Sequence, residues 1–284
     1  GVRYIDETRF TRNTYALPGG PFTFEGEGDF TDTLPRFAVS YDVNNNWNLY
    51  ANYAKGRRSP VVDASAAGTT ITKAEIVDSY DLGVKYQSAN FIFSGAIFTY
   101  EYSDYQQSYT DQETMQSITV TVGDSTMSGI EGMATYNYSD TLTFTASLGF
   151  LDAEFADNTS DGSPFQYGGN KFRLAPEVSG AININKVVHF DNWTMDVNWL
   201  TSFQSEVFFE SSNYPGMSQD TYSLTDFSLK LNRESSEFAY EFYVNNLFDK
   251  EFLIDAGNTG GRIGIPTFVR GMPRIAGVRL YYAF

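Results

Sequence analysis

The last eight residues of this chain restrict its fold more than any other stretch. In residues 277–284 every second side chain is apolar, and the chain stops on an aromatic ring. Only a period of two puts these apolar side chains on one face, so we expect a β-strand. Soluble proteins seldom end on an exposed apolar strand, because such an edge promotes aggregation. The apolar positions are Val278, Leu280, Tyr282 and Phe284.

The composition favours a sheet over helices as a way of entering a membrane. The chain of 284 residues has 20 tyrosines and 24 phenylalanines, yet hydrophobic residues make up only 42% of it. Its apolar runs, such as residues 91–93 and 95–98, are much shorter than the ~18 residues that a membrane helix requires. Strands with one face in lipid and one in water would have this composition. A closed sheet also satisfies every backbone group in lipid.

The charge and the cysteine content exclude several classes of function. A net charge of −16 argues against a nucleic-acid partner, which requires a basic surface. The chain has no cysteine, so disulfides and thiolate metal sites are excluded. It starts with Gly1 and shows no signal segment, which predicts a processed chain or a piece of a longer one.

Short turn signals recur along the chain, each flanked by segments of alternating polarity. The alternation is clearest over residues 142–150 and 193–199, and short turns between such segments are typical of β-hairpins. The predicted turns are 44–46, 88–90, 139–140, a looser 186–191, and 233–236.

Longer polar stretches separate these hairpins. Short turns at one end and long loops at the other are typical of outer-membrane barrels, whereas a soluble sandwich, the alternative, would have shorter strands. About twelve strands are expected, the first over residues 1–10 and the last over 270–284. The expected loops are 13–32, 57–73, 156–170, 209–220 and 254–268, with a shorter one near 108–114.

Aromatic residues gather where the strands would meet water. Amphipathic rings settle at the level of lipid headgroups, so two girdles are expected; strand propensity alone is the alternative explanation. The loop-side girdle would contain Phe98, Tyr100, Tyr102 and Tyr105, and the turn-side girdle Tyr136, Tyr138, Tyr281 and Tyr282.

Several segments resemble the carboxy-terminal half of a TonB-dependent outer-membrane receptor. Residues 46–60 resemble that family's strand leading into an outer loop through a Gly-aromatic-Arg-x-Pro element, with Arg57 in place of the aromatic residue. Residues 277–284 resemble the carboxy-terminal assembly signal of outer-membrane barrels. The other matching segments, in the family's order, are 74–85, 128–132, 174–177 and 243–252.

This resemblance implies an all-β fold, an antiparallel transmembrane β-barrel in the bacterial outer membrane. The family's barrel has about twenty-two strands around a plug domain, so residues 1–284 would form the carboxy-terminal portion of the barrel and no plug. The implied partners are outer-membrane lipid, the missing plug and amino-terminal strands, and the TonB system through that missing part. The implied function is active import of a scarce nutrient, in this family most often a ferric siderophore. The implied ligand is therefore a ferric chelate or another small nutrient. The alternatives are a self-contained, passive, porin-like barrel of twelve strands and, third, a barrel enzyme.

The sequence gives little support for catalysis or for a metal site. His189, the only histidine, falls in a predicted turn at the short-turn end, whereas serine hydrolysis needs a base beside the nucleophile. Residues 157–162 have alternating oxygen ligands but lack the bidentate glutamate of a calcium loop. Glu25, Glu27 and Asp29 are interpreted as a solvated loop. No enzyme activity, metal or cofactor is therefore expected.

The candidate functional residues fall into two groups. Charged residues on the polar side of a strand are expected to line the water-filled interior and, in a whole receptor, to contact the plug: Asp42, Lys85, Asp196, Asp226, Lys230, Glu241 and Arg279. Aromatic and guanidinium groups at the outer end would hold an anionic, ring-bearing chelate: Arg57, Arg58, Tyr105, Tyr109, Phe165, Tyr167, Tyr214 and Arg262.

Overall fold

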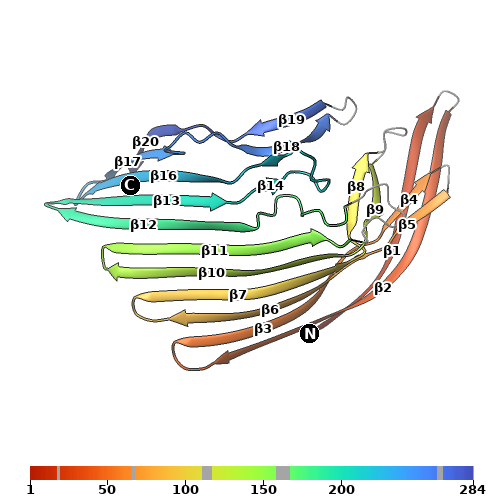
Figure 1. The fold of residues 1–284 in the computed structure, drawn as a ribbon, viewed down its shortest axis with the longest axis horizontal. Coiled ribbons are helices and arrows are strands. Elements are labelled where there is room, and N and C mark those ends of the chain that lie inside the picture. The colour runs from red at the N-terminus through yellow and green to blue at the C-terminus, as the bar shows by residue number, and fades with distance from the viewer. Residues whose placement is uncertain (18–19, 66–67, 111–116, 158–166, 261–264, 284) are drawn as a thin grey trace.

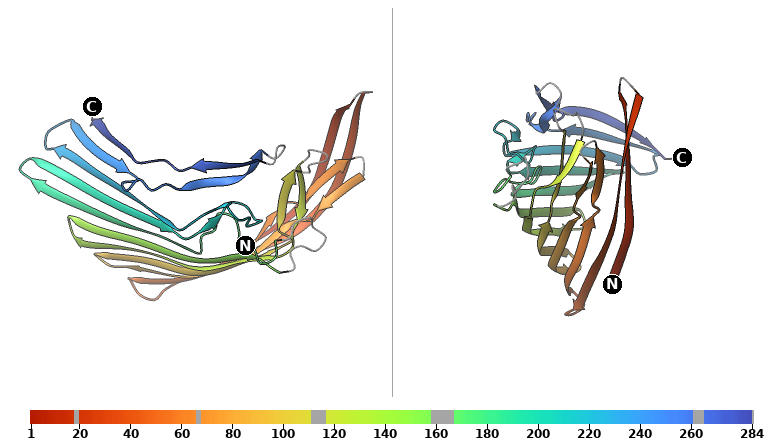
Figure 2. Two further views of the ribbon diagram at one scale, coloured as in Figure 1. Left: turned by 45° about the horizontal axis from the view of Figure 1, so that its top comes forward. Right: turned by 90° about the vertical axis from the view of Figure 1, so that its right-hand side faces the viewer.

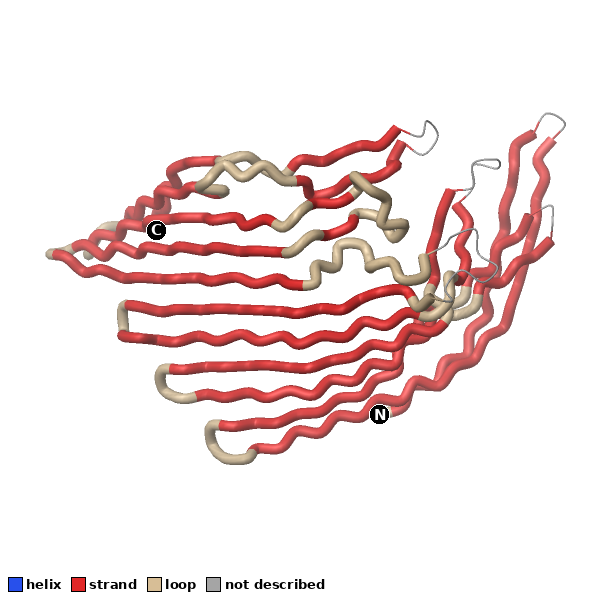
Figure 3. Tube along the Cα trace, in the orientation of Figure 1, coloured by secondary structure: helices blue, strands red, loops and turns tan. Residues whose placement is uncertain are grey.

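Twelve strands form one antiparallel sheet in the computed structural model (Figure 1), which describes residues 1–17, 20–65, 68–110, 117–157, 167–260 and 265–283. Strands and loops account for all described residues in Figure 3. Among the described residues, no helix is long and apolar enough to cross a membrane. In spatial order the strands are β1 (Val2–Leu17), β2 (Gly20–Asp42), β3 (Trp47–Arg58), β6 (Glu75–Gln87), β7 (Phe91–Ser103), β10 (Ser125–Ser139), β11 (Leu142–Phe155), β12 (Val178–Phe190), β13 (Trp193–Gln204), β16 (Tyr222–Arg233), β17 (Phe238–Asn245) and β20 (Ile275–Tyr282).

The order of strands confirms the expected antiparallel sheet of about twelve strands. β1 and β20 are the two ends of that order, and each pairs with a single neighbour among the described strands. The sheet is a curved, open surface in which the two chain ends lie apart (Figure 2). This open form does not favour a self-contained barrel of twelve strands, because each open edge leaves unpaired backbone groups that lipid cannot satisfy.

The strands join through short turns at one end of the sheet, here called the short-turn end. The turns near 44–46, 88–90, 139–140 and 233–236 are confirmed. The looser turn expected over 186–191 is corrected, because β12 continues to Phe190 and the chain turns at Asp191 with a φ of 49°. Asp is one of the few residues other than glycine that adopts this conformation readily.

Alternation gives the sheet an apolar face and a polar face. Leu82, Ile97, Ile130 and Phe150 are direct cross-strand neighbours on the apolar face, and all four side chains are exposed. Three residues nearer the short-turn end, Lys85 pairs in the same way with Ser94 on the polar face. Exposed apolar side chains on one face and polar ones on the other are the arrangement of a membrane barrel.

Four small hairpins extend the sheet at the opposite, loop end. Several segments expected to be loops, namely 13–32, 57–73 and 254–268, contain paired strands instead: β1 reaches Leu17 and β2 starts at Gly20. Their polar composition suits strands that stand in water on both faces. The small strands are β4 (Val61–Ser65), β5 (Gly68–Thr72), β8 (Gln106–Thr110), β9 (Ser117–Thr121), β14 (Val207–Phe208), β15 (Ser218–Gln219), β18 (Leu253–Gly260) and β19 (Ile265–Arg270).

The β4–β5 hairpin packs on the long β1–β2 hairpin, and a glycine allows the contact. A Cβ atom at Gly26 would lie 2.8 Å from Thr69 Cγ2 and 3.3 Å from Val62 Cγ1. Thr11 Oγ1 donates to the carbonyl of Val62 at 2.5 Å, and Asn13 Nδ2 donates to Asp63 Oδ1 at 2.8 Å. Gly26 therefore belongs to a packed arm, although its surroundings in the sequence favoured a loop.

A turn-side aromatic girdle is present, with altered membership. Ring contacts on the apolar face run from Trp47 through Tyr86 and Phe91 to Tyr136, with centroid distances of 4.6, 5.9 and 6.4 Å. By the alternation of their strands, Tyr138 and Tyr282 belong to the same face of the sheet as these rings, and Tyr281 belongs to the opposite face. Only one of two successive residues reaches each face, so Tyr281 belongs to the polar face.

The loop-side girdle is corrected for the same reason. Phe98 and Tyr100 stack on each other at 5.3 Å, and Tyr100 donates to Asp81 Oδ1 at 3.2 Å. Asp81 and Lys85 are four residues apart on β6 and therefore lie on the same, polar face of the sheet. The rings of Phe98 and Tyr100 therefore line the polar face. The apolar face carries Phe37, Tyr53 and Tyr80 near this level, with ring distances of 6.2 and 5.1 Å.

Candidate functional site

A network of charges crosses three strands on the polar face. Cross-strand register puts Lys230 beside Glu241 and Glu241 beside Arg279. Arg279 Nη1 lies 3.0 Å from Glu241 Oε2, and the Tyr281 hydroxyl donates to the same oxygen at 2.5 Å. Two cations also stack on tyrosine rings: Arg279 over Tyr243 at 4.0 Å and Lys230 over Tyr281 at 4.6 Å. Alternation thus brings three of the predicted interior charges into one cluster.

The remaining predicted interior charges share this face. Asn48 Nδ2 donates to Asp42 Oδ1 at 2.7 Å, and Lys85 Nζ lies 5.4 Å from the Tyr50 ring centre. Asp226 Oδ1 accepts from the backbone N–H of Asn246 at 2.8 Å. Asp196 pairs with Lys230 across the β13–β16 ladder. The polar face therefore offers charged groups of both signs along most of its width.

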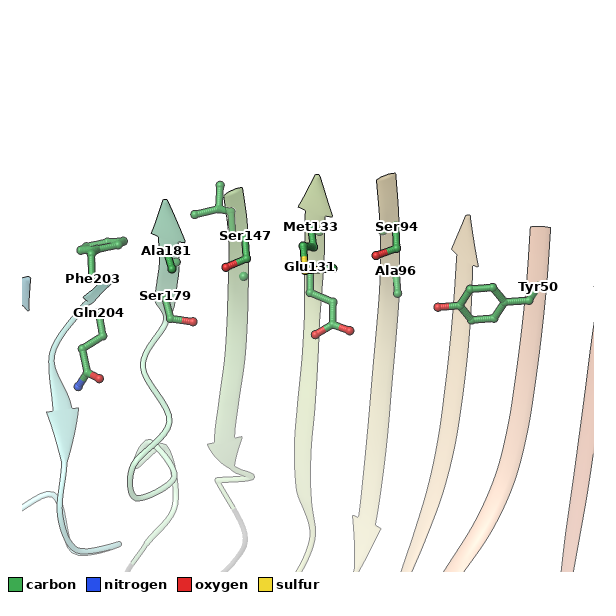
Figure 4. A pocket seen from close by; sticks show the side chains of 15 residues that line it. Tyr50, Ser94, Ala96, Glu131, Met133, Ser147, Ser179, Ala181, Phe203 and Gln204 are labelled. Atoms are coloured by element: carbon green, nitrogen blue, oxygen red, sulfur yellow. The ribbon is translucent and has the colours of Figure 1, made fainter. Parts of the chain in front are cut away.

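A hollow of about 520 Å³ lies midway along the sheet, and its lining residues come from β3, β7 and β10 to β13. Small side chains line it, among them Ser94, Ser147 and Ser179 (Figure 4), so it is recessed between bulkier neighbours. Glu131, on β10, is the one charged residue among the described residues that line it. The Tyr50 ring lies at its edge, where it covers Gly83 so closely that a Cβ atom there would overlap the ring. This hollow presents a carboxylate among hydroxyl groups.

A separate aromatic core organises the loop end, and we call it the outer-loop cluster. Its buried members are Val122, Ala153, Phe155, Tyr167 and Phe172. Tyr105 packs against Phe155 at 5.5 Å and Phe172 at 5.4 Å. Phe155 in turn lies 5.4 Å from Tyr167. Burial raises the pKa of Tyr105 and of Tyr167, because a buried site disfavours the charged phenolate.

Gln106 connects the outer-loop cluster to the neighbouring hairpins. It is buried, and its Nε2 donates to the carbonyls of Ser59 at 3.0 Å and Lys73 at 2.7 Å. Its backbone N–H donates to Glu75 Oε2 at 2.8 Å. Arg58 Nη1 donates to the Gln106 carbonyl at 3.1 Å. These bonds fix the ends of β3, β5 and β8 relative to one another.

A second set of bonds links the outer-loop cluster to the β13–β16 connection. Asn170 Nδ2 donates to the carbonyl of Ser211 at 2.9 Å, and the backbone N–H of Lys171 donates to Asn213 Oδ1 at 2.6 Å. A smaller core of Val207, Phe209 and Ala256 continues toward β18. The described part of the loop end is thus cross-linked by packing and hydrogen bonds.

Arg57, one of the predicted ligand-binding residues, has an almost fully buried side chain. Its side chain is 2% exposed, and Nη1 donates to Glu7 Oε1 at 2.6 Å, while Nε forms an ion pair with Asp32. Glu7 also contacts Arg9 Nη2 at 3.0 Å. Nη2 of Arg57 is buried and has no hydrogen-bond partner among the described residues.

The other predicted ligand-binding residues occupy different environments. Arg58, Tyr105 and Tyr167 belong to the connected region around the outer-loop cluster. Tyr214 is 66% exposed, next to Asn213, in the β14–β15 connection. Tyr109 lies in β8, and its side chain is outside the described set. Phe165 and Arg262 lie outside the described residues.

Of the predicted assembly signal, three residues are described and share the apolar face. Val278 and Leu280 pair with Phe242 and Tyr240, and Tyr282 pairs with Phe238. Phe284 lies outside the described residues. The alternation on which the signal was predicted is therefore present in β20.

Sequence reasoning missed three arginines, Arg3, Arg9 and Arg36, that the fold brings together with the predicted Arg57. Arg3, Arg9, Arg36 and Arg57 line one cavity of about 530 Å³ at the loop end. Arg3 and Arg9 are separated by an even number of residues, so the sequence alone could have predicted that both lie on one face of a strand. Arg36 and Arg57 join them only through the register of β1 against β2 and the bend of that hairpin, which no local pattern records.

A sequence model of the "TonB dependent receptor-like, beta-barrel" family matches residues 1–247, most of the chain. The chain belongs to this family of bacterial outer-membrane β-barrel receptors and transporters. That membership confirms the family, the fold class and the outer-membrane location expected from the sequence.

The relatives agree with this assignment. The chain is 22% identical over 255 residues to the "Pesticin receptor" of Yersinia pestis, an alignment that covers 89% of this chain and 36% of that protein. Among solved structures, it is similar to the ferric yersiniabactin uptake receptor FyuA from Yersinia pestis, with a TM-score of 0.83 at 19% identity, covering 100% of this chain and 42% of that one. The ferric preacinetobactin receptor BauA from Acinetobacter baumannii gives a TM-score of 0.71 at 15% identity, with coverage of 99% and 40%.

The chain therefore spans little more than a third of the length of the curated relatives it matches. At these identities the structural likeness establishes the fold alone. This chain and the receptors share the fold of one part of the barrel, the part that corresponds to the twelve-stranded sheet.

Proposed function

We propose that this chain forms the carboxy-terminal part of the barrel of a TonB-dependent transporter that imports a ferric siderophore. The single observation that carries this proposal is the open twelve-stranded sheet, with exposed apolar side chains on one face and a charged network on the other. Such a sheet needs further strands to close in lipid. The relatives' names support the substrate class, since they include a ferric yersiniabactin uptake receptor and a ferric preacinetobactin receptor.

In this proposal the two ends of the sheet have different roles. The outer hairpins capture the chelate through exposed groups at the loop end, such as Arg58 and Tyr214. Tyr105 and Tyr167 contribute by holding the loops in place, because they are packed inside the outer-loop cluster. The polar face, with Glu131, Glu241 and Arg279, contacts the plug of the same receptor. Energy from the TonB system reaches the plug through the part of the protein outside this chain.

Uptake of radioactive iron tests the proposal directly. The full-length receptor that carries this segment is produced in a strain without other siderophore receptors, with or without a functional TonB system. We expect saturable uptake of a ferric siderophore that disappears when TonB is removed. Uptake that persists without TonB and rises linearly with concentration would support the passive porin-like alternative instead.

A further inference from the structure

The apolar face of the sheet is recessed near its centre, because small residues gather there. Register puts Gly132 beside Gly95 on β7 and, in the next row, Ala134 beside Ala146 on β11. Gly180, on β12, lies in the same row as Gly132. None of these residues has a side chain larger than a methyl group, so the backbone of four adjacent strands lies close to the surface here.

Two apolar hollows of about 620 and 460 Å³ occupy this recess. They adjoin, since Phe93, Gly132 and Leu148 line both of them, and we call the pair the apolar groove. A Cβ atom at Gly132 would have no neighbour closer than 3.7 Å, so the space above this glycine is open. Bulky apolar side chains form the other walls: Leu82, Ile97, Ile130, Phe150, Ile182 and Phe203.

The apolar groove belongs to the apolar face alone. Glu131 and Ser147 also border it, but their side chains lie in the hollow on the polar face (Figure 4). Its walls are open to the surroundings, since Ile130, Leu148 and Ile182 are 57%, 47% and 55% exposed. Atoms that line an unfilled recess lack dispersion contacts on one side, so an occupant of matching shape stabilises it.

Other parts of the proposed receptor do not reach the apolar groove. Its lining comes mainly from β6 to β13, inside the sheet, whereas further strands would pair at β1 and β20. The plug would contact the opposite, polar face. A second copy related by a twofold axis would present the same recess to itself, and two facing recesses leave a gap. Lipid hydrocarbon, which surrounds the outer face of a membrane barrel, is the occupant that fits.

The depth of the apolar groove identifies the leaflet. On β10, Gly132 lies four residues from Tyr136 of the turn-side girdle, a distance of about 14 Å along the strand. This is less than half of the roughly 30 Å of a bilayer's hydrocarbon core, and the tilt of barrel strands reduces the depth further. The six adjacent strands β6 to β13 also span about 24 Å, more than the roughly 15 Å of one leaflet's hydrocarbon.

From these observations we infer that the apolar groove binds one acyl chain of a phospholipid in the leaflet at the short-turn end. In hydrocarbon, close packing rather than the hydrophobic effect determines which apolar surfaces associate. The small residues at Gly132 and Ala134 let the chain approach the backbone, and Phe93 and Leu148 contact it from the sides. This lipid is held longer than the lipids around the rest of the barrel. The inference depends on the membrane location and is independent of the imported substrate.

Photocrosslinking of the full-length receptor tests this site. The receptor is placed in phospholipid vesicles that contain a trace of a phospholipid with a diazirine in the middle of one acyl chain. After illumination, mass spectrometry of peptides locates the adducts. We expect adducts on Phe93, Leu148 and Ile182 to exceed those on Phe242 and Val278 about threefold or more, because the latter two are exposed on the same face outside the groove. Equal labelling of both sets would overturn the inference.

Ala134→Leu fills the groove, and Ala51→Leu is its matched control on the same face but outside the groove. Adducts on Leu148 and Ile182 should fall about threefold or more in Ala134→Leu and stay unchanged in Ala51→Leu. A heat-modifiability gel verifies that both variants fold, and Gly132→Leu replaces Ala134→Leu if the latter does not. The inference is overturned if the filled groove is labelled like wild type. It is also overturned if native mass spectrometry shows a wild-type dimer that Ala134→Leu dissociates, since a second copy would then occupy the groove.

Discussion

The guanidinium of Arg57 donates to the carboxylate of Glu7 across 2.6 Å and so joins segments that are 50 residues apart. Asp32, on the partner strand of Glu7, contacts the same guanidinium. The top of β3 is thereby tied to both strands of the β1–β2 hairpin. This connection positions the arm that carries Arg3, Arg9 and Arg36.

Arg57→Ala is expected to release the β1–β2 hairpin from β3. Removal of one partner of a buried ion pair leaves the other charges uncompensated and is strongly destabilising. Limited proteolysis of the full-length receptor should show cleavage of the arm accelerated by about tenfold or more. Arg12→Ala, which removes an exposed pair with 61% and 50% of the side chains accessible, should have little effect. Equal cleavage rates in the two variants would contradict the role given to Arg57.

Gly129 and Gly132 lie three residues apart on β10 and should respond very differently to alanine. A Cβ atom at Gly129 would lie 2.5 Å from the carbonyl oxygen of Phe150, which backbone pairing holds in place. At Gly132 the nearest atoms are 3.7 Å away. Gly129→Ala should therefore cost about 1–3 kcal/mol of unfolding free energy through overpacking, and Gly132→Ala much less. Urea unfolding of the refolded full-length barrel measures both.

Phe155→Ala should disorganise the outer-loop cluster and leave the sheet intact. Phe155 touches Tyr105, Tyr167 and Phe172, and truncation of a buried phenylalanine typically costs about 3–5 kcal/mol. Hydrogen exchange should rise in residues 167–175 and 117–123 while β10 to β13 remain protected. Tyr214→Ala serves as the control, since that side chain is exposed. Unchanged exchange in the Phe155 variant would show that the cluster does not hold the loops.

The outer-loop cluster should loosen at alkaline pH. Burial raises the pKa of Tyr105 and Tyr167 above the ordinary tyrosine value of 10.0, so the folded state holds these protons more tightly than the unfolded state. Their contribution to stability is complete below the unfolded pKa and is lost as pH rises through the folded pKa. Proteolysis of the loop end should therefore accelerate above about pH 10. A Tyr105→Phe/Tyr167→Phe variant should lack this alkaline step, and an identical step in it would assign the transition to other groups.

Periodicity was sufficient to predict the sheet. Alternation such as that of residues 142–150 identifies a strand and its apolar face without knowledge of its neighbours, because successive side chains point to opposite faces. The same rule places Asp42, Glu241 and Arg279 on the polar face. The same rule also puts Phe98, Tyr100 and Tyr281 on the polar face, although their aromatic rings and their position near the strand ends favour the girdles.

The loop end could not be predicted in the same way. The β1–β2 arm is rich in glycine, threonine and charge, a composition that favours a loop, and only its contact with β4–β5 explains its extended pairing. The meeting of Arg3, Arg36 and Arg57 depends on strand register and on the direction of that arm. Long-range geometry of this kind leaves no signal in a single sequence.

Cysteine labelling tests the central claim, that one face of these strands meets lipid and the other meets water. The chain has no cysteine, so a single introduced thiol reports on its own position. Ser147 and Leu148 are successive residues of β11 on the polar and apolar faces. In outer membranes that contain the full-length receptor, a small water-soluble thiol reagent should modify Ser147→Cys and spare Leu148→Cys, and the same should hold for Asn183→Cys and Ile182→Cys. Rapid modification of the Leu148 and Ile182 variants, with the polar-face pair protected, would contradict the account.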